Sequence, residues 1–339
     1  MDVDTEIPAH ASRNSIPVKD KDFREFLAPV IKYTFRVDPY GVVTPEDDSP
    51  AEIDLADTYH GEEASKASIR RPSQVFDSKP GTDVILLGHA HPPVGRSVSH
   101  VDVSLRVGPI AKTVRAHGLR VWQLPSIGAL KPGPARPIRE PIPLIYELAW
   151  GGMDFSDEKK PVGEPRNYVG RGVARDPRTL ADMPAAQLED PAKPLDGRSR
   201  EPAAFNPIHR HWQPRASYAG TYDDVWMATR MPLLPADFDV RYHVCVPPDQ
   251  WSAVPLRGDE PFEILGATPE GVWRFQLPRV ALGFSSWTKG QRTEHRTYLD
   301  TILVDADAGR VELTWRTAIP LPRKYEMLER VLVFEKDVV

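Results

Sequence analysis

Apolar and polar residues alternate most regularly between residues 83 and 122. Every second position is apolar on one face and polar on the other, with Val101, Val103, Leu105 and Val107 opposed to Asp102, Ser104 and Arg106. A period of two is typical of a half-buried β-strand. Because a Gly-Pro pair interrupts the alternation at residues 108–109, the pattern predicts an antiparallel hairpin.

Other runs rich in β-branched and aromatic residues also favour strands. They span residues 29–41, 83–91, 142–152, 238–246, 261–268 and 271–278. Residues 298–320 predict a further hairpin, in which Asp307 to Gly309 provide the turn.

Few segments favour helix. Residues 221–231 are the strongest candidate, because Thr221 and Asp224 fit a capping box and Pro232 ends the segment. Weaker helical patterns occur at 22–27, within 178–190 and at 324–331.

Proline is unusually frequent, with 36 residues among 339, about twice the usual share of roughly 5%. Proline removes a backbone donor and disfavours helix in the residue before it. The sequence therefore predicts a mainly β fold with antiparallel sheets, sandwich- or barrel-like, long proline-rich loops and a few short helices.

Residues 1–27 are expected to form an N-terminal arm. Residues 28–339 are expected to form one large domain, or two lobes divided by the loop-rich segment 151–215.

The net charge and the short apolar runs argue against nucleic-acid and membrane partners. The net charge of −5 carries no basic excess of the kind that nucleic-acid binding requires. The acidic N-terminus is unlike a signal peptide, and apolar runs such as residues 84–87 are far shorter than a membrane span. We expect a cytoplasmic protein with no membrane partner.

The single cysteine, Cys245, lies in an apolar run and is interpreted as a buried small side chain rather than a catalytic thiol paired with His243.

Glycine pairs raise the question of a phosphate loop. Gly151 and Gly152 end a strand-like run, and Gly170 and Gly172 form a G-x-G pair. No P-loop motif is present. No helix-forming segment follows Gly151 and Gly152, and the Gly170–Gly172 pair lacks both a third glycine and a preceding strand. We therefore interpret the four glycines as structural turns and expect no cofactor.

Histidines offer a metal alternative. His89 and His91 form one H-x-H pair, and His209 and His211 form another. Two residues at i and i+2 of a strand face the same way, as a pair of metal ligands requires. The simpler interpretation is four loop histidines. Hydrolase motifs such as G-x-S-x-G and H-E-x-x-H are absent.

Aromatic residues favour protein binding. The chain has eight tryptophans, several of them beside arginine or proline. Trp, Tyr and Arg dominate the energy of protein–protein contacts, although core packing accounts for many tryptophans.

A series of segments along nearly the whole chain is similar to one bacterial family. They are IKYTFRVDPYG, DTYHGE, KPGTDVILLGHAH, DVSLRVGP, YELAWGG, NYVGRGV, HWQPR, AGTYDDVWMATRMPLLPADFD, LRGDEPFEILGATPEG and LDTILVDADAGRVELTWR. They resemble domain-of-unknown-function family 2169, which is encoded in type VI secretion clusters. One departure is Asn167-Tyr168, where the family commonly has Asn-Pro.

The resemblance implies a non-enzymatic adaptor or chaperone. Such a protein would bind a secreted effector, or its PAAR domain, and help to load it onto the VgrG spike. No catalytic residue or cofactor comes with the family. We predict contact surfaces in the segments 151–215 and 219–230, with Arg171, Trp212, Tyr222, Trp226 and Arg257 as contact residues. Two alternatives stay open: a metal-dependent enzyme that uses the H-x-H pairs, and a structural component exported with the secretion machine.

Overall fold

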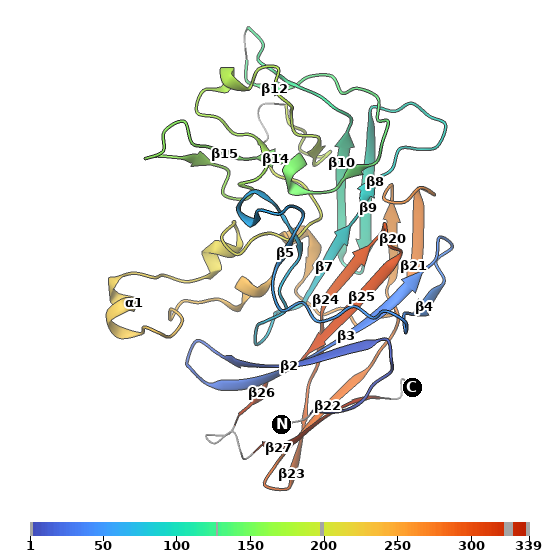
Figure 1. Cartoon of the computed structure of the whole chain (residues 1–339), viewed down its shortest axis with the longest axis vertical. Helices are drawn as coiled ribbons and strands as arrows, with labels where there is room; N and C mark the ends of the chain where they lie inside the picture. Colours follow the sequence, from blue (N-terminus) through green and yellow to red (C-terminus); the bar gives the residue numbers. More distant parts are fainter. Residues whose placement is uncertain (1–2, 127, 197–199, 322–327, 337–339) are drawn as a thin grey trace.

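The computed structural model describes residues 3–126, 128–196, 200–321 and 328–336. Two large sheets and a smaller one occupy most of this region (Figure 1). The largest sheet has the order β19 (Trp251–Ser252), β7 (Thr82–Leu87), β24 (Tyr298–Asp305), β25 (Arg310–Arg316), β3 (Glu25–Val37) and β2 (Ala11–Lys19), with β4 (Val43–Pro45) and β26 (Ile319–Pro320) also paired to β3. Its pairs are antiparallel except for β7 with β24.

The second sheet is antiparallel and lies against the first. Its order is β18 (Leu188–Glu189), β10 (Ile110–His117), β9 (His100–Val107), β20 (Pro261–Leu265) and β21 (Val272–Gln276). A third sheet near both termini has the order β1 (Val3–Glu6), β27 (Leu328–Glu335), β22 (Leu282–Thr288) and β23 (Gln291–His295).

Short two-stranded pairs fill the rest. They are β5 (Thr58–Tyr59) with β6 (Ile69–Arg71), β8 (His89–Ala90) with β13 (Ile142–Pro143), β11 (Trp122–Gln123) with β12 (Lys131–Pro132), β14 (Trp150–Gly151) with β17 (Arg171–Gly172), and β15 (Met153–Asp154) with β16 (Val162–Gly163).

Helices in the described residues are short. They comprise α1 (Asp224–Thr229) and the 3-10 helices η1 (Ala64–Lys66), η2 (Tyr146–Leu148), η3 (Pro177–Leu180), η4 (Arg215–Tyr218), η5 (Val240–His243) and η6 (Pro248–Gln250). None of these helices has the length and apolar character needed to cross a membrane. The predicted mainly β fold with antiparallel, sandwich-like sheets and a few short helices is confirmed.

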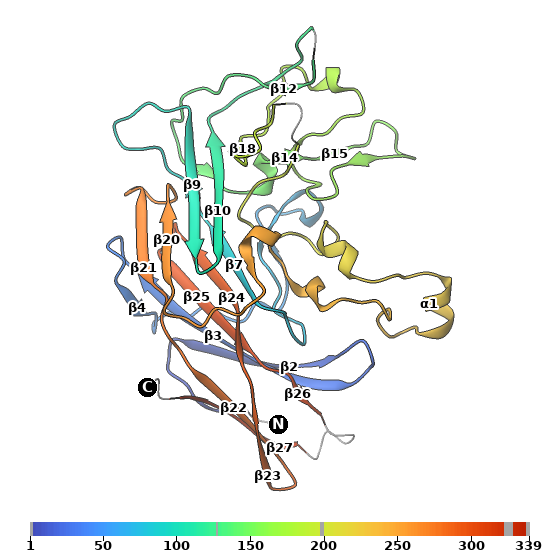
Figure 2. The same ribbon diagram turned by 180° about the vertical axis from the view of Figure 1, so that it is seen from behind.

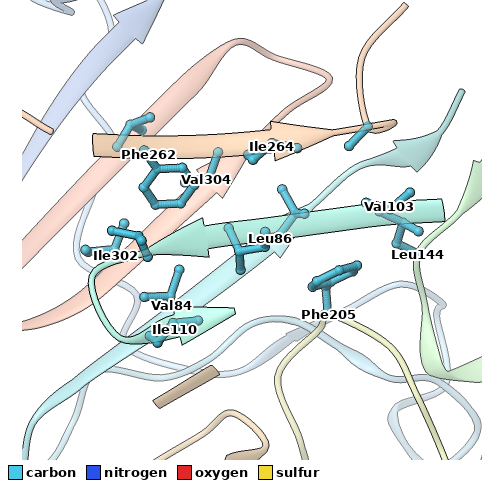
Figure 3. Close-up of a cluster of buried hydrophobic side chains, with 14 of the residues drawn as sticks. Val84, Leu86, Val103, Ile110, Leu144, Phe205, Phe262, Ile264, Ile302 and Val304 are labelled. Carbon is cyan, nitrogen blue, oxygen red and sulfur yellow. The ribbon is translucent and has the colours of Figure 1, made fainter. Parts of the chain in front are cut away.

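The main core lies between the two large sheets (Figure 3). Four residues of β7 and β24 face four residues of β9 and β20: Val84, Leu86, Ile302 and Val304 against Val103, Leu105, Phe262 and Ile264. All eight side chains are buried. The alternation predicted for residues 101–107 is therefore the alternation that points one face of β9 into this core.

The other face of the largest sheet carries charge, and it is buried as well. Residues 51–77 cross this face and cover it (Figure 1). Lys32 on β3 places its Nζ 2.6 Å from Asp54 Oδ2 and 3.3 Å from Glu312 Oε2 on β25. Arg71 contacts the same two carboxylates. Burial alone would raise the pKa of Asp54, but the Arg71 hydrogen bond and the Lys32 charge outweigh it and lower that pKa.

Two expected elements are wrong because aspartate side chains form turns. Residues 22–27 form no helical turn; Asp20 accepts the backbone N–H groups of Asp22 and Arg24, and the chain turns from β2 into β3. Residues 238–246 form no strand. Asp239 accepts the backbone N–H of Arg241 and begins the 3-10 helix η5 instead.

Two other expectations need adjustment. Residues 142–152 form only the short strands β13 and β14, with η2 between them. Of the helical pattern at 324–331, residues 324–327 lie outside the described residues and the rest begins β27. Within the expected N-terminal arm the structure describes β1 and β2, and β2 pairs with β3 over nine residues.

We predict that Glu312→Ala lowers the free energy of unfolding by about 3–5 kcal/mol, because it leaves the buried Lys32 and the partly buried Arg71 with one carboxylate, Asp54, between them. Glu263→Ala is the matched control, since it removes a carboxylate paired with the exposed Arg274 and should cost less than about 1 kcal/mol. Urea unfolding measures both. Equal losses for the two variants would contradict this account of the charged face.

Candidate protein-interaction surface

Residues 219–239, called the α1 loop below, project away from the sheets (Figures 1 and 2). The loop leaves the body after η4, carries α1 near its tip and returns before η5. Gly220 opens it with a φ of +81°, a conformation that favours glycine.

Hydrogen bonds within the loop hold its shape. Both ends are tied together by Asp237, whose carboxylate accepts the backbone N–H of Thr221 at 3.0 Å and the Thr221 hydroxyl at 2.8 Å. The N-cap of α1 is Asp223, which accepts the Trp226 N–H. A helix is therefore present within the predicted segment 221–231, but it spans only Asp224–Thr229, and Thr221 closes the base of the loop instead of capping the helix.

The loop is also joined to the turn between β2 and β3. Arg230 donates from Nη2 to the Lys21 carbonyl and from Nε to the Leu234 carbonyl. Trp226 donates its indole N–H to the Leu233 carbonyl at 2.8 Å. These bonds connect the helix, the returning segment of the loop and the body of the protein.

Apolar side chains nevertheless face solvent on this loop. The exposed fractions are 54% for Tyr222, 68% for Val225, 59% for Met227 and 62% for Met231. Large contiguous patches of exposed apolar surface are a feature of interaction sites, so the loop is a candidate for one. Methionine suits such a surface because its flexible thioether adapts to different partners.

The five predicted contact residues fall in different places. Tyr222 and Trp226 lie together on the α1 loop, with ring centroids 4.7 Å apart. Arg171 is half-buried on β17, and burial lowers the pKa of its guanidinium. Arg257 is exposed on the approach to β20.

Trp212 is the wrong choice for a contact residue, because its side chain is fully buried. It packs edge-on against Tyr146 and Tyr168 and close to His209. Val225, Met227 and Met231 were not among the predicted contact residues. Val225 and Met227 lie in α1, which has only six residues and is too short to bury all its faces, and Met231 follows its C-cap.

The glycine turns bring β14 and β17 together as a parallel pair. Gly151, Gly152 and Gly172 have φ values of +149°, +110° and +129°. A Cβ on Gly170 would lie 2.4 Å from Asn167 Nδ2, so this position has no room for a side chain. The buried Asn167 amide donates to the carbonyls of Tyr146 and Trp150 and secures the turn.

The H-x-H pairs contact different groups. His89 Nδ1 lies 2.7 Å from Asp307 Oδ2, and His91 Nε2 lies 3.9 Å from Oδ1 of the same carboxylate. His209 hydrogen-bonds the Ala67 carbonyl, and His211 stacks on Tyr168. Across the described ranges, no group of three or more His, Cys, Asp or Glu side chains has the geometry to hold a metal ion.

Cys245 is buried beside Asp83, whose Oδ2 lies 3.1 Å from the thiol sulfur. Burial and then the Asp83 charge raise the pKa of the thiol above its usual value. A thiol held protonated in this way is a poor nucleophile.

A cavity of about 820 Å³ lies between β10, the 190–193 turn and the two prolines at the start of η6, Pro247 and Pro248. Residues Ala111, Lys112 and Thr113 of β10 form one wall, and Pro191, Pro202, Pro214, Pro247 and Pro248 contribute to the others. The buried Lys112 ammonium binds Asp249 at 3.0 Å and Gln250 at 2.8 Å. Burial lowers the pKa of Lys112 despite the opposing charge of Asp249.

These features define a mainly β protein with a projecting apolar loop and a proline-walled cavity. The chain belongs to the bacterial family described as "uncharacterized protein conserved in bacteria (DUF2169)", whose model matches residues 22–316. No curated protein and no solved structure matches the chain.

We predict that Asp237→Ala loosens the α1 loop, because Thr221 loses both of its hydrogen bonds to the other end of the loop. Amide hydrogen exchange should accelerate across residues 221–231 and stay unchanged in β9 and β10. Asp224→Ala is the matched control, since this exposed aspartate lies in the same loop but outside that link. Equal exchange in both variants would show that Asp237 does not hold the loop.

A second prediction concerns Glu189 on β18, which lies 2.7 Å from His117 Nε2 and 2.9 Å from Arg120 Nη2. Burial raises its pKa, but the hydrogen bond to His117 and the charge of Arg120 bring it down from 4.5 to about 2. A lowered carboxylate pKa stabilises the fold above pH 4.5, and this stabilisation is lost as the pH falls towards 2. The free energy of unfolding of Glu189→Gln should therefore fall less steeply across this window. If the free energy of unfolding changed with pH in the same way for the parent protein and Glu189→Gln, Glu189 would not be the group whose lowered pKa stabilises the fold.

Proposed function

We propose that this protein is a non-enzymatic adaptor that binds a type VI secretion effector, or the PAAR domain of that effector, through the α1 loop. It would act in the cytoplasm and help to load the effector onto the VgrG spike. The observation that carries the proposal is the set of exposed apolar side chains on an internally bonded, projecting loop. The type of partner rests on the family resemblance.

Physical chemistry favours this loop as a docking surface. Fully burying an apolar side chain of this size contributes about 1.5–3 kcal/mol. Binding also costs free energy when side chains and loops become ordered. The Asp237–Thr221 link and the Trp226–Leu233 bond already order the α1 loop, so less of the gain from burial is lost on docking.

We predict that Val225→Ser combined with Met227→Ser weakens binding of the effector encoded beside this chain by about tenfold or more, equivalent to at least about 1.4 kcal/mol. Isothermal titration with the purified effector measures the change. The matched control replaces Val94 and Val254, two valines exposed elsewhere, by serine.

Three results would count against the proposal. They are the absence of binding to either neighbouring effector, equal weakening by the control variant, and recovery of this chain among secreted proteins together with the spike. The last result would indicate an exported component instead of an adaptor.

A further inference from the structure

One edge of the second sheet is left open inside the cavity. Strand β10 continues from residue 110 to residue 117, but β18 pairs with it only at Arg115 and Ala116. The His117 N–H donates to the Gln187 carbonyl on the same side. Backbone groups alternate sides along a strand, so Arg115, Thr113 and Ala111 direct their N–H and C=O groups towards this outer edge.

The ladder stops because of the residues that follow β18. If its register continued, Pro191 would lie opposite Thr113, and proline has no N–H to donate. Asp190 turns the chain away, since its carboxylate accepts the Ala192 N–H and its carbonyl accepts the Lys193 N–H. In the described part of the chain, the backbone groups of Ala111 and Thr113 form no hydrogen bond across this outer edge.

The same two residues line the cavity of about 820 Å³. Unpaired strand groups that face a cavity form a template for another strand. We propose that this edge binds an extended segment of another polypeptide by strand addition, with Ala111 and Thr113 supplying the hydrogen-bonding groups.

The chemistry of the walls indicates which segment fits. Each cationic side chain among the described residues of the lining has a carboxylate partner: Lys112 with Asp249, Lys193 with Glu201 and Arg166 with Glu164. Within this described lining, no unpaired cation is present to attract an acidic ligand. Its prolines, together with Ala203 and Ile208, present apolar surface. The occupant is an uncharged extended segment with apolar side chains at alternate positions, because alternate side chains of an added strand face the same wall.

The test begins with selection of dodecapeptides from a displayed random library on the full chain. A selected peptide is then titrated against the parent protein, Thr113→Pro and Gln276→Pro. Proline at residue 113 removes an outward N–H, whereas the backbone hydrogen bonds from β10 to β9 come from the alternate residues, such as 112 and 114. Gln276 is the matched control, since it lies on the outer edge of β21, outside the cavity.

We expect selected peptides to be uncharged and alternating, and to bind Thr113→Pro at least about tenfold more weakly than the parent protein or Gln276→Pro. Bound peptide should also slow amide exchange at residues 111–113. N-methylation of alternate peptide residues should abolish binding to the parent protein, which tests the ladder even if Thr113→Pro does not fold.

The inference is overturned if no peptide is selected, if binding survives both Thr113→Pro and N-methylation, or if protection appears only elsewhere. It does not rest on the α1 loop. If no effector binds, the proposed function is wrong, but peptide binding at β10 can still be observed. If no peptide binds at β10, this inference is wrong, but binding of an effector to the α1 loop can still be observed.

Discussion

The structure depends on a sheet that is buried on both faces. In β25, Val311, Leu313 and Trp315 point into the apolar core, whereas Glu312, Thr314 and Arg316 point to the other side. An apolar face needs only packing, but a buried charge needs a partner. Asp54, Arg71 and Lys32 meet this need for Glu312, and Asp300 does so for Arg316. The segment that covers the charged face is thereby fixed in position by ion pairs.

The prolines are concentrated in other segments. The segment 51–77, which covers the charged face, contains a single proline, Pro72, whereas five prolines line the cavity at β10 and two, Pro232 and Pro235, lie in the returning part of the α1 loop. Proline stiffens a chain and reduces the entropy that is lost on folding. Both proposed binding surfaces therefore consist of segments that are already ordered in the folded protein.

Much of the fold could be predicted because half-buried strands have a sequence in which apolar and polar residues alternate. Val101 to Val107 and the hairpin at 298–320 were found from period and turn chemistry alone. Failures occurred where one side chain changed the local path: Asp239 turns a β-branched run into a 3-10 helix, and Asp20 closes a turn where a helix was expected. The site was harder to predict. Trp212 and Trp226 look alike in sequence, and only tertiary packing distinguishes the buried ring from the one on the projecting loop. The open edge of β10 could not be predicted from the sequence, because it depends on the residue at which the pairing of β18 with β10 ends.

The position of that edge has a consequence for selectivity. Exposed strand edges endanger a protein because a second folded sheet can pair with them and start aggregation. Here the unpaired backbone groups of Ala111 and Thr113 lie beside a recess bounded by the 190–193 turn and by Pro247 and Pro248. In the proposed strand addition, these walls would restrict access by the edge of a second folded sheet more than access by a single extended segment. The recess would therefore disfavour pairing between two copies of the chain.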